Sequence, residues 1–240
     1  MKENIPVIIL CGGKGSRLKE ETEFRPKPMV TIGGKPILWH IMKIYQHFGF
    51  NKFIIALGYK GKMISDYFKR KENAEFDVKL IDTGLATLTG ERVLRLKNYI
   101  DAQRFMVTYG DGIGDVNIKK LVKFHAIKYT IGTITGVHPI SKWGLIIRDT
   151  DGRVISFKQK PKLDEFVNGG FMIFDKSFFE YLRTKEMIED AFLRVIREKQ
   201  LSVYLHNGFW RAMDTYQDMD ELNKLWEDDP RWKVWESNHD

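Results

Sequence analysis

An apolar run that breaks into glycines near the start of the chain constrains the fold most. Residues 5–10 read Ile-Pro-Val-Ile-Ile-Leu, and residues 11–18 read Cys-Gly-Gly-Lys-Gly-Ser-Arg-Leu. A short apolar run without alternation is typical of a strand buried on both faces, as in a parallel sheet. The glycines directly after it predict a loop whose bare backbone a ligand can approach closely.

Positive charge gathers in the same stretch. Lys14, Arg17, Lys27 and Lys35 all follow the strand. Backbone N–H groups and cations both complement phosphate oxygens, so the segment suits a triphosphate. It is neither of two familiar phosphate motifs: no window supplies the P-loop, and Leu18 stands where the third glycine of the dinucleotide fingerprint belongs.

The bulk composition limits the class of protein. The chain has 240 residues, 43% of them hydrophobic, which is ordinary for a globular protein, and we expect a single domain over residues 1–240. No apolar stretch approaches the roughly 20 residues needed to cross a bilayer. The first strand begins too early to leave room for a signal peptide, and the single cysteine can form no internal disulfide, so we expect a cytoplasmic protein.

The formal charge of +7 raises the question of nucleic acid. However, the basic residues are scattered along the chain, and no helix-turn-helix, zinc-finger or RNA-binding motif accompanies them. A lysine-rich surface that keeps the protein soluble explains the charge more simply. We therefore expect small-molecule substrates, with neither nucleic acid nor a membrane as a partner.

Strands alternate with helices along the rest of the sequence. We expect helices over residues 36–45, 63–70, 91–99, 118–126, 177–182, 187–198 and, capped by Thr215, 215–226. We expect strands over residues 5–10, 52–57, 78–82, 104–109, 131–137, 171–174 and 201–206, and a hairpin of 143–148 with 153–157. This order predicts an α/β fold with a Rossmann-like, mostly parallel sheet and helices on both faces.

Three strand ends carry candidate ligand-binding residues. Residues 58–61, Gly-Tyr-Lys-Gly, follow the second strand, where open parallel sheets bind ligands. The Thr/Gly-rich stretch 83–92 could hold a nucleobase or a sugar, or could simply cap the following helix. Asp111 lies between two glycines at the tip of a buried strand, which suits a ligand of Mg²⁺, although Gly-Asp-Gly is also a common tight turn.

Two features in the second half suggest a second anion site. Lys158, Lys160 and Lys162 shortly precede Asn168-Gly169-Gly170, an arrangement that suits a phosphate monoester; a solvated basic loop is the alternative. Asp214 is another isolated carboxylate, which could bind a metal or could start the helix that follows.

Two other features have a structural and a functional interpretation. His40, within the first helix, could be catalytic, but a packed histidine is the simpler reading. The tryptophans at 226, 232 and 235 are expected to pack across the domain or at a subunit contact, because nothing apolar follows to bury them.

Taken together, the motifs resemble those of the nucleoside-diphosphate-sugar pyrophosphorylases, the sugar nucleotidyltransferases, and among these the glucose-1-phosphate cytidylyltransferases. The matching stretches are residues 12–18, 27–30, 33–42, 58–61, 82–84, 89–90, 109–112, 160–162, 168–171, 208–210, 213–215 and 232–236. They span nearly the whole chain in order. The resemblance implies the nucleotidyltransferase, GT-A-like architecture.

The resemblance also implies a reaction in which CTP and a sugar 1-phosphate, with glucose 1-phosphate the first expectation, give a CDP-sugar and pyrophosphate. Arg17 and Lys27 would be catalytic, holding the triphosphate, and Asp111 and Asp214 would hold Mg²⁺. Nucleotide binding would fall to Leu10, Gly12, Gly13, Gly15, Ser16, Gly58, Thr83, Gly84 and Gly110. Sugar-phosphate binding would fall to Gln159, Lys160, Asn168 and Gly169. The resemblance further suggests a homo-oligomer and a role in polysaccharide biosynthesis.

Three departures from the family pattern limit these expectations. Gln159 replaces the usual glutamate, which exchanges an acceptor-only carboxylate for an amide and bears on sugar choice. Glu91 replaces a glycine, which places a carboxylate near the expected nucleotide. The segment 68–78 is shorter than expected and lacks an insertion that can touch a neighbouring subunit. A related enzyme using UTP, dTTP or another phosphorylated substrate, and a non-catalytic sugar-nucleotide-binding module, remain alternatives.

Overall fold

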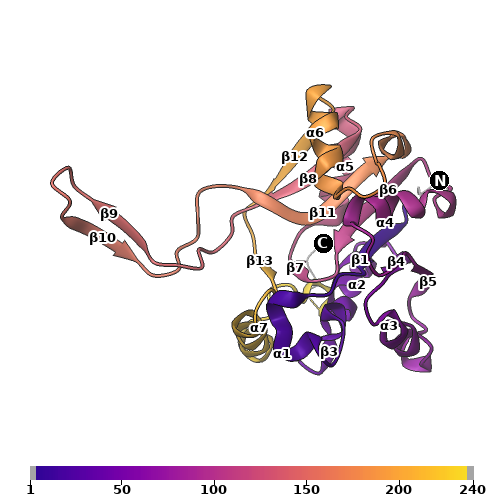
Figure 1. Ribbon diagram of the computed structural model, residues 1–240, viewed down its shortest axis with the longest axis horizontal. Coiled ribbons are helices and arrows are strands. Elements are labelled where there is room, and N and C mark those ends of the chain that lie inside the picture. Colours follow the sequence, from indigo (N-terminus) through magenta and orange to yellow (C-terminus); the bar gives the residue numbers. More distant parts are fainter. Residues whose placement is uncertain (1–3, 237–240) are drawn as a thin grey trace.

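One seven-stranded sheet runs through the computed structural model, which describes residues 4–236 (Figure 1). The strand order is β12–β8–β11–β6–β1–β4–β5. The strands are β1 (Val7–Cys11), β4 (Lys52–Leu57), β5 (Asp77–Asp82), β6 (Arg104–Tyr109), β8 (Gly132–Val137), β11 (Val167–Asp175) and β12 (Leu201–His206). Neighbouring strands are parallel except at β11, which runs antiparallel to both β6 and β8. The prediction of a mostly parallel sheet in an α/β fold is confirmed.

The central strand β1 is buried on both faces because its side chains enter two different cores. Val7, Ile9 and Cys11 belong to one cluster, and Ile8 and Leu10 belong to the other. Successive side chains of a strand point to opposite faces, so a continuous apolar run serves both layers at once. Strand β1 therefore lies in the middle of the sheet. The glycine loop follows it directly, at the end of the sheet where the parallel strands have their carboxyl ends.

Helices cover both faces, as predicted. The first core is closed by α2 (Ile37–His47) and α5 (Ile118–Lys128), and the second by α4 (Thr89–Arg95) and α6 (Ile188–Arg197). The remaining helices are α1 (Lys19–Thr22), α3 (Gly61–Phe68) and α7 (Tyr216–Asp228). No helix within residues 4–236 is both long and apolar enough to cross a bilayer.

Several boundaries differ from the predictions. The helix expected over residues 177–182 is a 3-10 helix, η5 (Lys176–Glu180), which begins one residue earlier and ends two residues earlier. The helix expected over 91–99 begins at Thr89, ends at Arg95 and gives way to a 3-10 turn, η4 (Lys97–Tyr99). The strand expected over 171–174 is the nine-residue β11, because its pairing with β8 already begins at Val167; the pairing is irregular between Asn168 and Met172, where Gly170 has φ +82°.

The predicted hairpin is present and extends away from the body of the protein. It consists of β9 (Leu145–Arg148) and β10 (Val154–Lys158), which, among the strands of residues 4–236, pair only with each other. In Figure 1 it is the long projection at the left. We call residues 143–158 the arm.

The three C-terminal tryptophans pack within the chain, around His40 of α2. The Nε2 atom of His40 lies 2.9 Å from the Ile32 carbonyl oxygen, and its Nδ1 atom accepts a hydrogen bond from Trp232. Trp226 and Trp235 also contact the ring. Burial lowers the pKa of His40 to about 4, so the ring is neutral at physiological pH. The packed interpretation of His40 is confirmed, and the tryptophans bind the last helix to α2.

Candidate active site

The glycine loop after β1 folds over the side chain of Lys27. Gly15 has φ +64°, and a Cβ atom there would lie 2.9 Å from Thr22 and 3.0 Å from the Cβ atom of Lys27. The Thr22 hydroxyl donates to the Gly15 carbonyl oxygen. Pro26 and Pro28 flank Lys27 and begin the short 3-10 helix η2 (Lys27–Met29). The loop thus holds Lys27 almost fully buried, at 7% exposure, with its ammonium group facing the sheet edge.

A two-stranded ribbon brings the two predicted metal carboxylates together. β7 (Gly112–Gly114) pairs antiparallel with β13 (Trp210–Ala212), and Ala212 lies opposite Gly112. The Met213 N–H donates to the Asp111 carbonyl oxygen at 2.9 Å, which continues the pairing by one step. Asp111 and Asp214 therefore emerge side by side, although one comes from the middle of the chain and the other from its end.

The ammonium group of Lys27 bridges these two carboxylates. Its Nζ atom lies 2.7 Å from Asp111 Oδ2 and 2.8 Å from Asp214 Oδ1. Arg17 Nη1 donates to the other oxygen of Asp214 at 2.7 Å, and Lys142 Nζ lies 3.8 Å from that oxygen. Burial acts to raise the pKa of Asp214, but the hydrogen bond from Lys27 and the nearby cations outweigh it and hold the pKa below its usual range. We call Arg17, Lys27, Asp111 and Asp214 the ion cluster.

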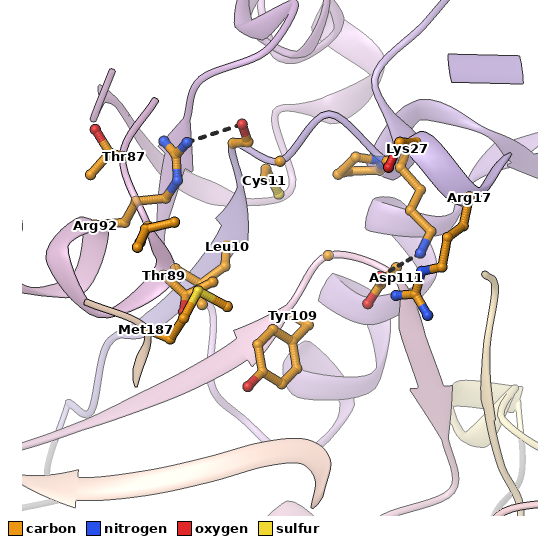
Figure 2. Close-up of a pocket in the computed structure, with 17 residues that line it drawn as sticks. Leu10, Cys11, Arg17, Lys27, Thr87, Thr89, Arg92, Tyr109, Asp111 and Met187 are labelled. Atoms are coloured by element: carbon orange, nitrogen blue, oxygen red, sulfur yellow. Dashed lines mark hydrogen bonds and ion pairs between the residues drawn. The ribbon is translucent and has the colours of Figure 1, made fainter. Parts of the chain in front are cut away.

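Two cavities lie on either side of the ion cluster. The first has a volume of about 350 Å³ and is lined by the end of β1, the glycine loop, the end of β6, residues 87–89 and Arg92. Figure 2 shows Lys27, Arg17 and Asp111 at one end of it, and Arg92 and Met187 at the other. The second cavity, about 240 Å³, is lined by residues at the base of the arm and by β13 and the start of α7, and Asp214 belongs to its lining. The cluster is thus reached from both cavities.

Arg92 joins the ends of three strands beneath the first cavity. Its guanidinium donates to the carbonyl oxygens of Gly12, Leu57 and Gly84, which follow or end β1, β4 and β5. It also donates to the Thr83 hydroxyl at 2.6 Å. Burial lowers the pKa of Arg92, yet the carbonyl dipoles around it satisfy the charged form. This side chain therefore fixes the strand ends at the base of the first cavity, where a nucleotide would lie.

The Glu91 carboxylate points away from the first cavity. Its Oε1 atom accepts from Arg95 at 2.8 Å, and its Oε2 atom accepts from the Lys185 N–H at 2.9 Å. These bonds lower the pKa of Glu91, the backbone bond most strongly. The unusual residue thus ties α4 to the loop before α6, and its charge is neutralised outside the expected nucleotide site.

The residues predicted for the nucleotide fall into two groups in the structure. Those that line the first cavity are Leu10, Gly12, Gly13, Gly15, Ser16 and Gly110, together with Arg17, Lys27 and Asp111. Gly58, Thr83 and Gly84 lie behind the lining: Gly58 packs against Gly12, and the other two bind Arg92.

The residues predicted for the sugar phosphate are also divided. Lys160 lines the second cavity, and its Nζ atom lies 3.7 Å from Glu221 Oε1. Asn168 and Gly169 line neither cavity, but Gly169 lies beside β13, because the Trp210 indole donates to its carbonyl oxygen. Gln159 lines neither cavity and packs toward Gly144 in the arm.

Sequence reasoning missed several lining residues. Tyr109 and Met187 line the first cavity, and Lys142 and Arg211 line the second. Met187 precedes α6 and reaches the cavity only because α6 packs beside α4, which no local pattern reveals. Lys142 and Arg211 stood in the sequence beside recognised motifs, and their positive charge was the available signal.

The carboxylate pair fits a divalent cation of the hard, oxygen-loving class. A single ammonium group already stands within hydrogen-bond distance of both carboxylates, so a cation can bridge them. Within residues 4–236 no group of three or more His, Cys, Asp and Glu side chains is placed to hold a metal. Two carboxylates with phosphate oxygens and water completing the shell is the arrangement that Mg²⁺ favours.

Comparison with known proteins places this fold and site in a family. The family described as nucleotidyl transferase matches residues 6–229. "Probable glucose-1-phosphate cytidylyltransferase" of Bacillus subtilis is 40% identical over 95% of this chain and 99% of its own length. Glucose-1-phosphate cytidylyltransferase of Salmonella typhimurium is 38% identical over the same shares. The solved structure of HddC from Yersinia pseudotuberculosis, complexed with GMP-PN, has a TM-score of 0.74 at 26% identity and covers 92% of this chain and 99% of that one.

The sheet is mostly parallel, and a glycine loop, a buried lysine and paired carboxylates lie at the carboxyl ends of its strands. This combination defines a class of proteins that bind nucleotide phosphates. The chain belongs to the nucleotidyl transferase family and is an enzyme of that family. The resemblance inferred from the sequence motifs is confirmed.

Proposed function

We propose that the protein transfers a cytidylyl group from CTP to a sugar 1-phosphate, giving a CDP-sugar and pyrophosphate, with glucose 1-phosphate as the sugar substrate. The observation that carries this proposal is the position of Lys27, whose ammonium group lies between Asp111 and Asp214 where the two cavities approach each other. The choice of CTP and glucose 1-phosphate is supported by the names of the relatives that match along almost their whole length.

Each substrate has a cavity whose chemistry suits it. In the proposal, the nucleotide occupies the first cavity, with its base toward Thr87–Thr89 and its triphosphate along the glycine loop toward Arg17 and Lys27. Backbone N–H groups and two cations complement the phosphates there. The sugar 1-phosphate occupies the second cavity, where Lys142, Lys160 and Arg211 supply positive charge.

The chemistry is a displacement at phosphorus. An oxygen of the sugar phosphate attacks the α-phosphorus of CTP, the bond between the α-phosphorus and the bridging oxygen breaks, and pyrophosphate leaves with the electron pair. The attacking phosphate is already an anion, so no side-chain base is required. Lys27 and Arg17 would neutralise charge on the triphosphate and the departing pyrophosphate, and the cavities would align the reactants.

We further propose that Asp111 and Asp214 hold Mg²⁺ between the two substrates. The ion would supply positive charge that bridges the nucleotide and the attacking phosphate. In the structure the Lys27 ammonium group binds both carboxylates. As the nucleotide enters, this group would leave the carboxylates and bind phosphate oxygens instead. In this proposal the two carboxylates position Mg²⁺ and take no part in proton transfer.

The proposal extends to the organisation of the enzyme. We propose that residues 1–240 act as one nucleotidyltransferase domain and that the protein is a homo-oligomer, with no nucleic-acid or membrane partner. Because CTP and sugar phosphates are cytoplasmic metabolites, we place the reaction in the cytoplasm, as a step supplying activated sugar for polysaccharide synthesis.

A nucleotide screen tests the proposal. Pyrophosphate release is measured with Mg²⁺ and each of CTP, UTP, dTTP, ATP and GTP, against a panel of sugar 1-phosphates. Release with CTP and glucose 1-phosphate is expected, and an Asp111→Asn variant should lose it. Release only with UTP or dTTP would overturn the choice of nucleotide, and release only with another sugar phosphate would overturn the choice of sugar. Folded protein that binds CTP but releases no pyrophosphate with any pair of nucleotide and sugar phosphate would indicate a binding module rather than an enzyme.

A further inference from the structure

The ribbon that brings Asp111 and Asp214 together has few side chains to fix its register. Its three residue pairs are Gly114 with Trp210, Ile113 with Arg211, and Gly112 with Ala212. Contacts between facing side chains normally stabilise one register of an antiparallel pair. Two of these three pairs contain a glycine, which has no side chain to contribute. Side-chain contacts between β7 and β13 therefore do little to fix how the strands are aligned.

Asp115, the residue directly after β7, makes a contact that does fix the alignment. Its Oδ1 atom accepts the Phe209 N–H at 2.7 Å, and its own N–H donates to the Phe209 carbonyl oxygen at 3.2 Å. The Nε2 atom of His206, the last residue of β12, lies 2.8 Å from the same Oδ1 atom. We call Asp115 and His206 the clamp. It joins the end of β7 to the turn that leads from β12 into β13.

The backbone of this turn passes very close to the clamp. A Cβ atom on Gly208 would lie 2.4 Å from Asp115 Oδ1 and 2.7 Å from His206 Cε1. A Cβ atom on Gly114 would lie 2.7 Å from the Phe209 carbonyl oxygen. Because no Cβ atom fits at either position, glycine is required at both. The turn and the end of β7 are therefore built to fit each other in one alignment.

The clamp lies at the far end of the ribbon from the two carboxylates. Asp115 follows Asp111 by four residues, which is about 13 Å along an extended strand. Neither Asp115 nor His206 lines the first or the second cavity. The clamp can thus act on the site only through the register of the ribbon. A slip of one residue would move Asp214 by roughly 3.3 Å relative to Asp111 and turn its side chain to the other face.

We propose that Asp115, together with His206, is a positioning residue for the metal site, because the clamp fixes the register that sets Asp111 and Asp214 side by side. The Met213 N–H donates to the Asp111 carbonyl oxygen at 2.9 Å, next to both carboxylates, so its protection from exchange reports this register. The inference rests on the proposed function for the metal itself, whereas the alignment of the two carboxylates can be followed without any metal.

Two measurements on an Asp115→Ala variant test the proposal. Binding of Mn²⁺ to nucleotide-free protein, followed by electron paramagnetic resonance, should weaken by about 10–100-fold, the usual effect of losing a residue that orients metal ligands. Hydrogen exchange of the Met213 amide, followed by NMR without metal, should become at least about tenfold faster. Asp115→Asn should restore both values, because its amide oxygen can still accept the Phe209 N–H. An effect of the carboxylate charge alone would not be restored by asparagine.

Asn117→Ala is the matched control. Asn117 lies two residues beyond Asp115, and its Oδ1 atom accepts the Lys120 N–H at 2.9 Å at the start of α5. The substitution removes a side-chain-to-backbone hydrogen bond of the same kind, but one that serves a helix rather than the ribbon. Mn²⁺ binding and Met213 exchange should therefore keep their wild-type values in this variant.

Both readouts must change together in Asp115→Ala and return together in Asp115→Asn; a change in only one of them, or in neither, overturns the proposal. If Mn²⁺ neither binds the wild type nor supports its pyrophosphate release, the metal site of the proposed function fails, and Met213 exchange alone decides whether the clamp positions the carboxylates. If Asp115→Ala does not fold, His206→Ala decides instead. This variant must shift both readouts in the same direction, and unchanged values refute the proposal.

Discussion

Replacing Lys27 by methionine should strengthen metal binding and weaken catalysis at the same time. The substitution keeps an unbranched side chain but removes the ammonium group that lies 2.7 Å from Asp111 and 2.8 Å from Asp214. The two carboxylate oxygens are therefore no more than 5.5 Å apart, the sum of these distances. Without Lys27 they form a pair of acceptors that one divalent cation can bridge, since Arg17 binds the other oxygen of Asp214.

The size of the effect follows from the charges involved. A divalent ion roughly 4 Å from an ammonium group is repelled by about 8 kcal/mol at an effective dielectric of about 20. Asp111 is partly exposed, so solvent and salt screen most of this repulsion. We expect at least about 1.4 kcal/mol to remain, which is a tenfold tighter binding of Mn²⁺ to the nucleotide-free variant. Turnover should fall by about 10²–10³, the usual cost of removing one group that stabilises transition-state charge.

Electron paramagnetic resonance of free Mn²⁺ measures the first effect without any catalysis. Protein without nucleotide is titrated with Mn²⁺, and pyrophosphate release is measured on the same preparations. Lys62→Met is the matched control, because Lys62 pairs with Asp66 on the exposed surface of α3. A Lys27→Met protein that binds Mn²⁺ no more tightly than the wild type would refute the idea that Lys27 and the metal compete for the carboxylates.

Three further substitutions or conditions test other parts of the structure. Gly15→Ala should reduce turnover more than stability, because a Cβ at φ +64° costs about 1 kcal/mol and displaces Lys27; kinetics and urea unfolding of the same variant compare the two. Arg92→Lys should lower the free energy of unfolding by about 2–4 kcal/mol, because one ammonium group cannot serve the carbonyls of three strand ends; denaturant unfolding measures this, and a loss below 1 kcal/mol would contradict it. Stability should fall by about 3 kcal/mol between pH 6.5 and pH 4, because the folded protein holds His40 neutral with a pKa of about 4 while the unfolded chain protonates it near 6.5. Tryptophan fluorescence in urea follows this loss, and a His40→Gln variant that keeps the same pH slope would exclude His40 as its cause.

Local pattern was sufficient to predict the elements that lie in the middle of the sheet. The apolar run of β1 and the glycines after it define a buried strand and an open loop wherever they occur, because both depend on the chemistry of neighbouring residues. The same holds for the amphipathic helices α2 and α6, whose buried positions recur at helical spacing.

Features that depend on residues far apart in sequence could not be predicted in this way. The pairing of β7 with β13 involves three residues on each side, too few to show a periodic pattern, yet it sets Asp111 beside Asp214. The contact of Lys27 with both carboxylates depends on that pairing and on the folding of the loop over Lys27. The resemblance to a family named these residues together, but it did not predict that the lysine would hold the carboxylates itself.

The predictions for the sugar side were less complete for a related reason. Lys160 lies in the second cavity, whereas its neighbour Gln159 points into the arm, because Lys160 adopts a positive φ of 45° that turns the chain at the end of β10. A run of polar residues gives no sign of such a turn. The exposure of the arm was equally hidden, since its apolar strand residues are of the kind that a folded protein usually buries.

The direction of β11 decides whether the start of this strand lies at the same end of the sheet as the glycine loop after β1. Its first residues, Asn168 to Gly170, lie at the edge where β1 and β6 end, because β11 runs against both of its neighbours. Had this nine-residue strand run the other way, its starting end would lie about 30 Å away at the opposite edge, at about 3.3 Å per residue. A single reversal thus brings the start of β11 to the glycine-loop end of the sheet without a long crossover.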